Sequence, residues 1–380
     1  MAKLEELDVY PRLPIDVVGS EGNELICRDG RRVLDLYGGH CVNSLGGSHP
    51  GLGAAIASQW NEVSFLSNLF HHEPRAEFLE AFGALLPAGD WRVFFSNSGA
   101  EANENALKMA LAANGRPKVV AFEGAFHGRT AAAAAISDVK REAFTRAPFD
   151  VIRLPWGDLD AARAAIVDDV AAVVAEPIQS MAGVRMPPPG FLEGLSRLTT
   201  DAGAALIFDE VQTGSGRTGE AWAATTLGVT PDILTTAKGA AGGLPIGISV
   251  VSAPWAAAVP KGILGSTFGG GPTVLAAATY VARAVADPVF RARVVESGAA
   301  LVAAARLGPV REVRGAGLLL GLVLDRGLVA SEVRDSLLSE GVLVATSNDP
   351  EVLRLFPPLT FTPADAQRFG DAIARVATAV

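Results

Sequence analysis

The sequence predicts an α/β protein with a mostly parallel central sheet flanked by helices, and a smaller α+β domain after it. Two observations lead to this fold class. Short apolar runs alternate with helix-length segments through the middle of the 380 residues, the pattern of repeated βαβ units. Glycine or polar residues directly follow several of these runs, where an open α/β sheet places its ligand sites.

The expected elements follow in order along the chain. After the first run, a helix is expected over residues 101–113. Towards the C-terminus, residues 313–324 and 342–345 resemble strands, and residues 330–340 and 363–376 resemble helices. The apolar runs of the central sheet cover residues 93–95, 118–122, 171–175, 205–208, 233–236 and 246–251. We therefore expect three parts: an N-terminal segment (1–47) that packs with the small domain, a large domain (48–286) and a small C-terminal domain (287–380).

Composition excludes several classes of protein. The chain holds 32 Lys and Arg against 41 Asp and Glu, so 32 − 41 gives a net charge of −9. Such a chain is a poor candidate for binding nucleic acid or an anionic membrane. The apolar runs are far shorter than the roughly 20 residues of a membrane span, and two cysteines cannot build a disulfide framework. The histidines lack the spacing of a metal site, so we expect no bound metal. Because the low cysteine count fits a reducing compartment, we expect a cytoplasmic protein.

A lysine and an aspartate stand at the ends of two neighbouring runs. Lys238 follows residues 232–237 and precedes a glycine-rich stretch, and Asp209 ends the run one βαβ unit upstream. Pyridoxal phosphate needs this pair, an amine for covalent attachment and a carboxylate for its pyridine nitrogen. For Lys238 the alternative is a side chain that points to solvent. For Asp209 the alternatives are a structural ion pair or a cap on the next helix.

A candidate phosphate site opens the first expected helix. The segment from Ser98 to Glu101 has the spacing of a capping box, and the free N–H groups at a helix start favour an anion. The alternative is an ordinary helix start. The stretch 214–219 reads G-x-G-x-x-G, but it lies in mid-chain beside two carboxylates, so it does not predict a dinucleotide site. We expect a flexible glycine loop there.

Several long motifs together resemble the class III aminotransferases, a branch of the fold-type-I pyridoxal phosphate enzymes, over residues 34–358. The acetylornithine and succinylornithine aminotransferases are the most similar subgroup. The motifs are LDLYGGHCVNSLGGSHP (34–50), FFSNSGAEANENALKMA (94–110), VVAFEGAFHGRT (119–130), EPIQ (176–179), LIFDEVQTGSGRTG (206–219), PDILTTAKG (231–239), GSTFGG (265–270) and LRLFPPL (353–359).

The resemblance implies roles around the cofactor ring. Lys238 would hold pyridoxal phosphate covalently and later carry the proton, and Asp209 would pair with the pyridine nitrogen. Gln212 would bond the ring hydroxyl. Val211 would pack on one face of the ring and Phe126 on the other.

The resemblance also implies a phosphate site shared between two subunits. Ser98 would cap the helix start, and the backbone N–H groups of Gly99 and Ala100 would bind the phosphate. Thr267 would complete the phosphate site from the other subunit, and Ser266 would lie near the substrate. The active site would therefore require a homodimer.

Two arginines would bind substrate carboxylates. Arg129 resembles the residue that binds the α-carboxylate of the acylated donor, and Arg354 the one that binds 2-oxoglutarate. In many relatives a glutamate masks the second arginine, but Met181 stands at that position here. Arg354 should therefore be unmasked. Gly271 replaces an asparagine usual in the family.

The resemblance implies an acetylornithine-type transaminase (EC 2.6.1.11). It would move the terminal amine of N-acetylornithine, or of a similar N-acyl diamino acid, to 2-oxoglutarate. The products would be the N-acyl glutamate semialdehyde and glutamate, in arginine or lysine biosynthesis. Three alternatives stay open: another donor (ornithine, 4-aminobutyrate or a carrier-linked lysine precursor), an aminomutase, and a pyridoxal phosphate-binding regulatory protein without turnover.

Overall fold

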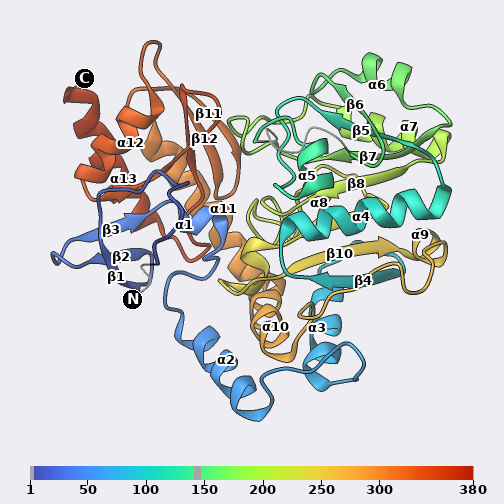
Figure 1. The fold of residues 1–380 in the computed structure, drawn as a ribbon. Helices are drawn as coiled ribbons and strands as arrows, with labels where there is room; N and C mark the ends of the chain where they lie inside the picture. The colour runs from blue at the N-terminus through green and yellow to red at the C-terminus, as the bar shows by residue number, and fades with distance from the viewer. Residues whose placement is uncertain (1–3, 141–146, 380) are drawn as a thin grey trace.

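The computed structural model describes residues 4–140 and 147–379, and a seven-stranded sheet forms the centre of its larger part (Figure 1). Strands β5 to β9 pair in parallel, and β10 runs antiparallel to both of its neighbours. The predicted α/β class with a mostly parallel sheet is therefore confirmed. In spatial order the strands are β4 (Trp91–Ser96), β10 (Gly247–Ser252), β9 (Ile233–Thr236), β8 (Ala205–Asp209), β7 (Val170–Ala175), β5 (Lys118–Phe122) and β6 (Asp150–Leu154).

Alternation along the strands gives the sheet two apolar faces. In β5, Val119 and Ala121 pack in the same cluster as Met109 of helix α4 (Gly99–Asn114). Val120 and Phe122 belong to the larger cluster on the other face. The layers of the α/β fold follow from this period of two. The other helices of this part are α2 (Pro50–Glu62), α3 (Glu73–Gly83), α5 (Ala131–Ile136), α6 (Leu159–Ala165), α7 (Phe191–Ala202), α8 (Ala223–Thr226), α9 (Ala253–Ala257) and α10 (Pro272–Ala286).

Two smaller sheets lie on the other side of the molecule, and helix α10 runs between the two parts (Figure 1). One sheet joins β1 (Val17–Glu21), β2 (Glu24–Cys27), β3 (Arg32–Asp35) and β13 (Val342–Leu343). Because β3 pairs with β13, the N-terminal segment shares a sheet with the C-terminal part. The domain limits at residues 47–48 and 286–287 stay a prediction, and residues 1–3 and 380 lie outside the described part.

The C-terminal strands differ from the prediction. Residues 313–324 do not form one strand: β11 (Val310–Ala316) and β12 (Leu319–Leu324) form an antiparallel hairpin that turns at Gly317, where φ is 54°. The stretch 342–345 is divided between β13 and β14 (Ala345–Thr346), which belong to different sheets. Strand β15 (Val352–Leu355) was not predicted. The remaining helices are α1 (Gly38–Cys41), α11 (Pro288–Ala305), α12 (Ala330–Ser339) and α13 (Pro363–Ala379).

The glycine-rich stretch 214–219 is buried and contacts both parts of the molecule. The guanidinium of Arg217, 3% exposed, donates hydrogen bonds to the carbonyls of Leu318 and Pro357. A Cβ atom on Gly216 would lie 3.2 Å from side-chain atoms of Leu359 and Val285. The stretch is therefore a packed connection. Within the described residues, no single helix is long and apolar enough to span a membrane.

Candidate active site

A pocket of about 490 Å³ opens at the carboxyl end of the parallel strands, and Asp209 and Lys238 both line it. Asp209 is the last residue of β8. Lys238 begins the short 3₁₀ helix η1 (Lys238–Ala241), which directly follows β9. These two strands are parallel neighbours, with Asp209 beside Thr235. The carboxylate and the amine therefore reach one edge of the sheet, where α/β proteins bind their ligands.

Asp209 is held in place by three hydrogen bonds. Its Oδ2 atom accepts one from Nδ1 of His127 at 2.8 Å and one from Nδ2 of Asn103 at 2.7 Å. Its Oδ1 atom accepts one from the backbone N–H of Val211 at 3.0 Å. Asn103 in turn accepts a hydrogen bond from the hydroxyl of Thr235 at 2.6 Å. Because the carboxylate is only 4% exposed, this network fixes its orientation.

The pKa of His127 is raised although the side chain is buried. Burial alone would lower its pKa, but the hydrogen bond to Asp209 and the charges of Asp209 and Glu176 raise the pKa above its ordinary value. The Nδ1 atom of His127 is the donor that a carboxylate acceptor requires. The protonated Nδ1 of His127 therefore holds the carboxylate of Asp209 in position.

Lys238 sits in a strained and desolvated position. Its φ of 42° lies in the left-handed region, which costs a residue other than glycine about 1–3 kcal/mol. Burial lowers the pKa of Lys238 below its ordinary value, although the negative charges of Asp209 and Glu176 oppose this shift. A lysine with a lowered pKa is a nucleophile towards a carbonyl carbon. The arrangement suits an amine that reacts with an aldehyde.

The start of helix α4 forms an anion site on the pocket wall. Ser98 is its N-cap and accepts a hydrogen bond from the backbone N–H of Glu101 at 3.2 Å. The Glu101 carboxylate reaches back to the backbone N–H of Asn97 at 2.7 Å, one residue earlier than a standard capping box would have it. A Cβ atom on Gly99 would lie 2.8 Å from Cγ1 of Val211, so this position requires glycine. The free N–H groups and the helix dipole favour a phosphate here.

These residues fit pyridoxal phosphate. A nucleophilic amine, a buried carboxylate and an anion-binding helix start surround one pocket, and Phe126 lines the same pocket. This donor set matches what the aldehyde, the pyridine nitrogen and the phosphate of the cofactor need. Of the predicted site residues, ten line the pocket in the structure: Ser98, Gly99, Ala100, Phe126, Arg129, Asp209, Val211, Gln212, Lys238 and Arg354.

The two predicted carboxylate-binding arginines differ in their surroundings. Arg129 is exposed at the pocket, whereas Arg354 is 3% exposed. Nε of Arg354 donates to the Thr346 carbonyl at 2.8 Å, and Nη1 donates to Oγ of Ser180 at 3.2 Å. Its burial lowers the pKa of Arg354 to about 10. Among the described residues, Arg354 makes no ion pair with a carboxylate, and Met181 lines the same pocket.

Ser266 and Thr267 lie outside this chain's own pocket. Thr267 is exposed, and Oγ of Ser266 accepts a hydrogen bond from Nδ2 of Asn97 at 3.3 Å. Neither is among the described residues that line the pocket. The expectation that they act in the other subunit's site stays a prediction.

The described pocket residues that were not assigned a role from the sequence include His40, Asn103, His127 and Glu176. Glu176, 6% exposed, accepts a hydrogen bond from the backbone N–H of Phe126 at 2.9 Å, and burial raises its pKa to about 7. All four occur within the motifs quoted above. The signal was therefore present in the sequence, but the contacts of Asn103 and His127 to Asp209, and of Glu176 to Phe126, depend on the tertiary fold.

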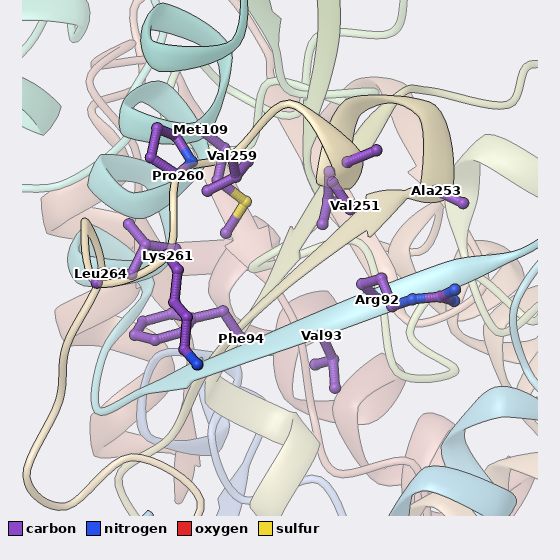
Figure 2. A pocket seen from close by; sticks show the side chains of 13 residues that line it. Arg92, Val93, Phe94, Met109, Val251, Ala253, Val259, Pro260, Lys261 and Leu264 are labelled. Carbon is purple, nitrogen blue, oxygen red and sulfur yellow. The ribbon is translucent and has the colours of Figure 1, made fainter.

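A second pocket, of about 520 Å³, lies away from this chemistry between β4, β10 and the segment 259–264 (Figure 2). Its walls are mostly apolar, with Met109, Phe94 and Val259 among the labelled side chains. Arg92 and Lys261 are its charged residues. None of the described residues that line this pocket is a carboxylate or a histidine, so it offers no general acid–base pair, and its larger volume does not make it the active site.

Comparisons with known proteins agree with this geometry. The chain matches the family described as aminotransferase class-III over residues 8–377. The acetylornithine aminotransferase of Mycobacterium leprae is 41% identical over 370 residues, covering 96% of this chain and 91% of that protein. The structure of N-acetylornithine aminotransferase from Stenotrophomonas maltophilia has a TM-score of 0.84 at 32% identity and covers 98% of each chain.

A further structure, the ornithine aminotransferase of Toxoplasma gondii, has a TM-score of 0.89 at 28% identity, covering 98% of this chain and 92% of that one. Another structure of that enzyme is described with partial occupancy of pyridoxal phosphate at its active site. The predicted family, cofactor and fold type are therefore confirmed.

Proposed function

Because the chain belongs to the class III aminotransferases, we propose that it moves the terminal amine of N-acetylornithine, or of a similar N-acyl diamino acid, to 2-oxoglutarate in the cytoplasm. The N-acyl glutamate semialdehyde and glutamate would leave as products, in arginine or lysine biosynthesis. The observation that carries the proposal is the single pocket in which Lys238, Asp209 and Arg129 meet. The names of relatives at about 41% identity support the acylated donor.

Lys238 would hold the cofactor and move the proton. Bound pyridoxal phosphate supplies an electron sink next to the substrate carbon that loses its proton. The amine of Lys238, whose pKa burial lowers, would accept that proton and return it one step later. Asp209 would stabilise the positive charge on the ring nitrogen, and His127 and Asn103 would keep its carboxylate in position.

The two arginines would orient the substrates by their carboxylates. A guanidinium binds a carboxylate with two parallel hydrogen bonds, which fixes direction as well as position. Arg129 at the pocket would bind the donor, so that its distant amine reaches Lys238. Buried Arg354 has no carboxylate partner in the described part of the chain, and 2-oxoglutarate would supply one.

An exposed aromatic patch supports a homodimer. Phe65 is 41%, Leu69 89%, Phe70 57% and Phe268 66% exposed, and the rings of Phe65 and Phe268 lie 5.5 Å apart. Such a patch is typical of a protein–protein contact. Thr267 directly precedes Phe268 of this patch in the chain. A second copy that covers the patch would therefore bring its phosphate site close to the Thr267 hydroxyl of the first copy.

Complementation between two inactive proteins tests the shared site. We expect Lys238→Ala and Thr267→Ala to be inactive or strongly impaired alone. In a mixed dimer, one of the two sites has both residues intact, so random reassortment should restore roughly a quarter of the wild-type activity. Mixed proteins that stay inactive after verified subunit exchange would contradict the shared site.

A spectrum of the purified protein tests the reaction. The band of the bound cofactor should fade with N-acetylornithine and return with 2-oxoglutarate, which would show both half-reactions. Lys238→Ala should abolish this change, while Lys261→Ala, in the other pocket, should leave it intact. A band that responds only to ornithine, 4-aminobutyrate or a carrier-linked lysine precursor would replace the donor. Interconversion of an amine without 2-oxoglutarate would indicate an aminomutase, and no response to any amine would indicate a regulatory protein.

A further inference from the structure

His40 stands on an unusual stretch of the pocket wall. The backbone of α1 is left-handed over four successive residues, with φ of 54° at Gly38, 59° at Gly39, 63° at His40 and 72° at Cys41. Left-handed backbone is easy for glycine and unfavourable for histidine and cysteine. Residues other than glycine that keep this conformation are concentrated at ligand sites.

The surrounding structure fixes this turn. The buried carboxylate of Asp35 accepts hydrogen bonds from the backbone N–H groups of Tyr37 at 2.9 Å and Gly38 at 2.8 Å. A Cβ atom on Gly38 would lie 2.8 Å from the carbonyl oxygen of Phe356. The turn is thus packed against the C-terminal part, and His40 lines the pocket from a fixed position.

The imidazole of His40 is uncharged among cationic groups. Its ring makes an edge contact with Tyr37, with centroids 4.6 Å apart, and it shares the pocket with Lys238, Arg129 and Arg354. Burial, and then the positive charges of Arg354, Lys238 and Arg129, lower the pKa of His40 to about 4. A neutral imidazole offers one N–H donor and one acceptor nitrogen.

An acylated donor and a free diamino acid differ at a single group. The acylated donor has an amide there, with one N–H and one C=O. The free amino acid has an ammonium there, which the guanidinium groups of Arg129 and Arg354 would repel. A neutral donor–acceptor side chain in the same pocket complements the amide and has no charge with which to compensate an ammonium.

We propose that His40 is a specificity-determining residue, which hydrogen-bonds the acyl amide of the donor and so selects it over free ornithine. This inference rests on the proposed function, because it requires an acylated donor. It assigns the choice of donor to the turn 38–41, in addition to the two arginines that bind carboxylates.

Two substitutions at His40 test this role without disturbing the turn. His40→Gly removes the side chain, and glycine adopts the left-handed backbone easily. His40→Asn keeps a hydrogen-bond donor and an acceptor, and asparagine tolerates the left-handed backbone better than most residues. Loss of one or two substrate hydrogen bonds should lower kcat/KM for N-acetylornithine in His40→Gly by about tenfold or more. The value for ornithine and the KM for 2-oxoglutarate should stay within about threefold, and His40→Asn should recover part of the loss.

Binding without turnover gives a second readout. In a Lys238→Ala background, calorimetry should show that His40→Gly weakens the binding of N-acetylornithine by a similar factor of about ten. His49→Asn is the matched control: His49 caps α2 outside the pocket, and asparagine can cap as well, so both measurements should stay near the wild-type values.

The outcomes separate the two proposals. If the wild-type enzyme uses N-acetylornithine and His40→Gly lowers the rates with both donors equally, or with neither, His40 has no role in donor choice while the proposed reaction stands. If the wild-type enzyme prefers a donor without an amide, its own donor rates contradict the proposed donor. The proposed role of His40 is then wrong as well.

Discussion

Nδ1 of His127 lies 2.8 Å from Oδ2 of Asp209, and both side chains are almost fully buried. Nδ1 of His127 must therefore carry a proton, because the carboxylate that it faces can only accept a hydrogen bond. Its pKa is raised by Asp209 and Glu176 in spite of the burial. The pair presents one oriented carboxylate to the pocket, and this carboxylate is the group that a protonated pyridine nitrogen needs.

The first prediction concerns that carboxylate. Asp209→Asn keeps the size of the side chain but removes its charge. It also places an amide N–H either against the N–H groups of both His127 and Asn103 or against the backbone N–H of Val211. Loss of an electrostatic group that acts in the transition state costs about 10²–10³ in kcat. Both half-reactions should slow, as measured by stopped-flow absorbance with each substrate alone.

Asp232 supplies the control for this substitution. It precedes β9 in the same sheet and accepts a hydrogen bond from the Leu206 backbone N–H at 2.8 Å, outside the pocket. Asp232→Asn should leave kcat within about threefold even if it lowers stability. A wild-type rate in Asp209→Asn would contradict the electrostatic role assigned to the Asp209 carboxylate.

The sequence predicted Asp209, Lys238 and the α4 start because each follows from local pattern. An apolar run that stops at a charged residue marks a strand end, and parallel strands bring their ends to one edge. His127, Asn103 and Glu176 could not be assigned in this way. Their roles depend on hydrogen bonds between residues 24 to 106 positions apart in the chain, formed only in the folded protein.

The C-terminal hairpin escaped prediction for a different reason. The apolar pattern continues from β11 into β12, so alternation alone does not show the turn. The turn at Gly317 is set by packing: a Cβ atom there would lie 2.5 Å from the backbone carbon of Thr218. The glycines at 315 and 317 were the available signal, because glycine inside a strand pattern often marks a turn or a close backbone approach.

The second prediction separates the two arginines. Arg354→Ala should raise the KM for 2-oxoglutarate by roughly 10- to 100-fold, since a hydrogen-bonded carboxylate contributes about 1.5–3 kcal/mol. Arg129→Ala should mainly raise the KM for N-acetylornithine. Arg163→Ala, an exposed arginine paired with Asp160, should change neither constant. Equal effects of Arg129→Ala and Arg354→Ala on both substrates would contradict the division of roles.

The third prediction concerns Met181, which lines the pocket with Arg354. Met181→Glu would add a carboxylate that competes with 2-oxoglutarate for this guanidinium. The KM for 2-oxoglutarate should rise by about tenfold, and the KM for N-acetylornithine should change less.

A second methionine controls for the added charge. Met186 is 38% exposed and lies outside the pocket, so Met186→Glu should leave both constants unchanged. If Met181→Glu binds 2-oxoglutarate as the wild-type protein does, then Arg354 is not the acceptor-binding group.

The last prediction concerns stability, through Glu210. Burial raises the pKa of this carboxyl to about 7 from an ordinary 4.5, although hydrogen bonds from Thr213, Ala224 and Ala223 oppose the shift. Between these two values the folded protein keeps a proton that the unfolded chain releases. The contribution of Glu210 is therefore fully present below pH 4.5 and is lost as the pH rises through about 7, a change on the order of 3 kcal/mol.

Glu210→Gln cannot titrate, so its free energy of unfolding should fall less than that of the wild type between pH 4.5 and 8. Urea unfolding at several pH values would measure this difference in slope, whatever the absolute stability of the variant. Glu220→Gln, ten residues further on and half exposed, should keep the wild-type slope. The prediction fails if the wild type and Glu210→Gln lose stability in parallel, because the hydrogen bonds to Glu210 would then hold the carboxylate ionised in spite of its burial.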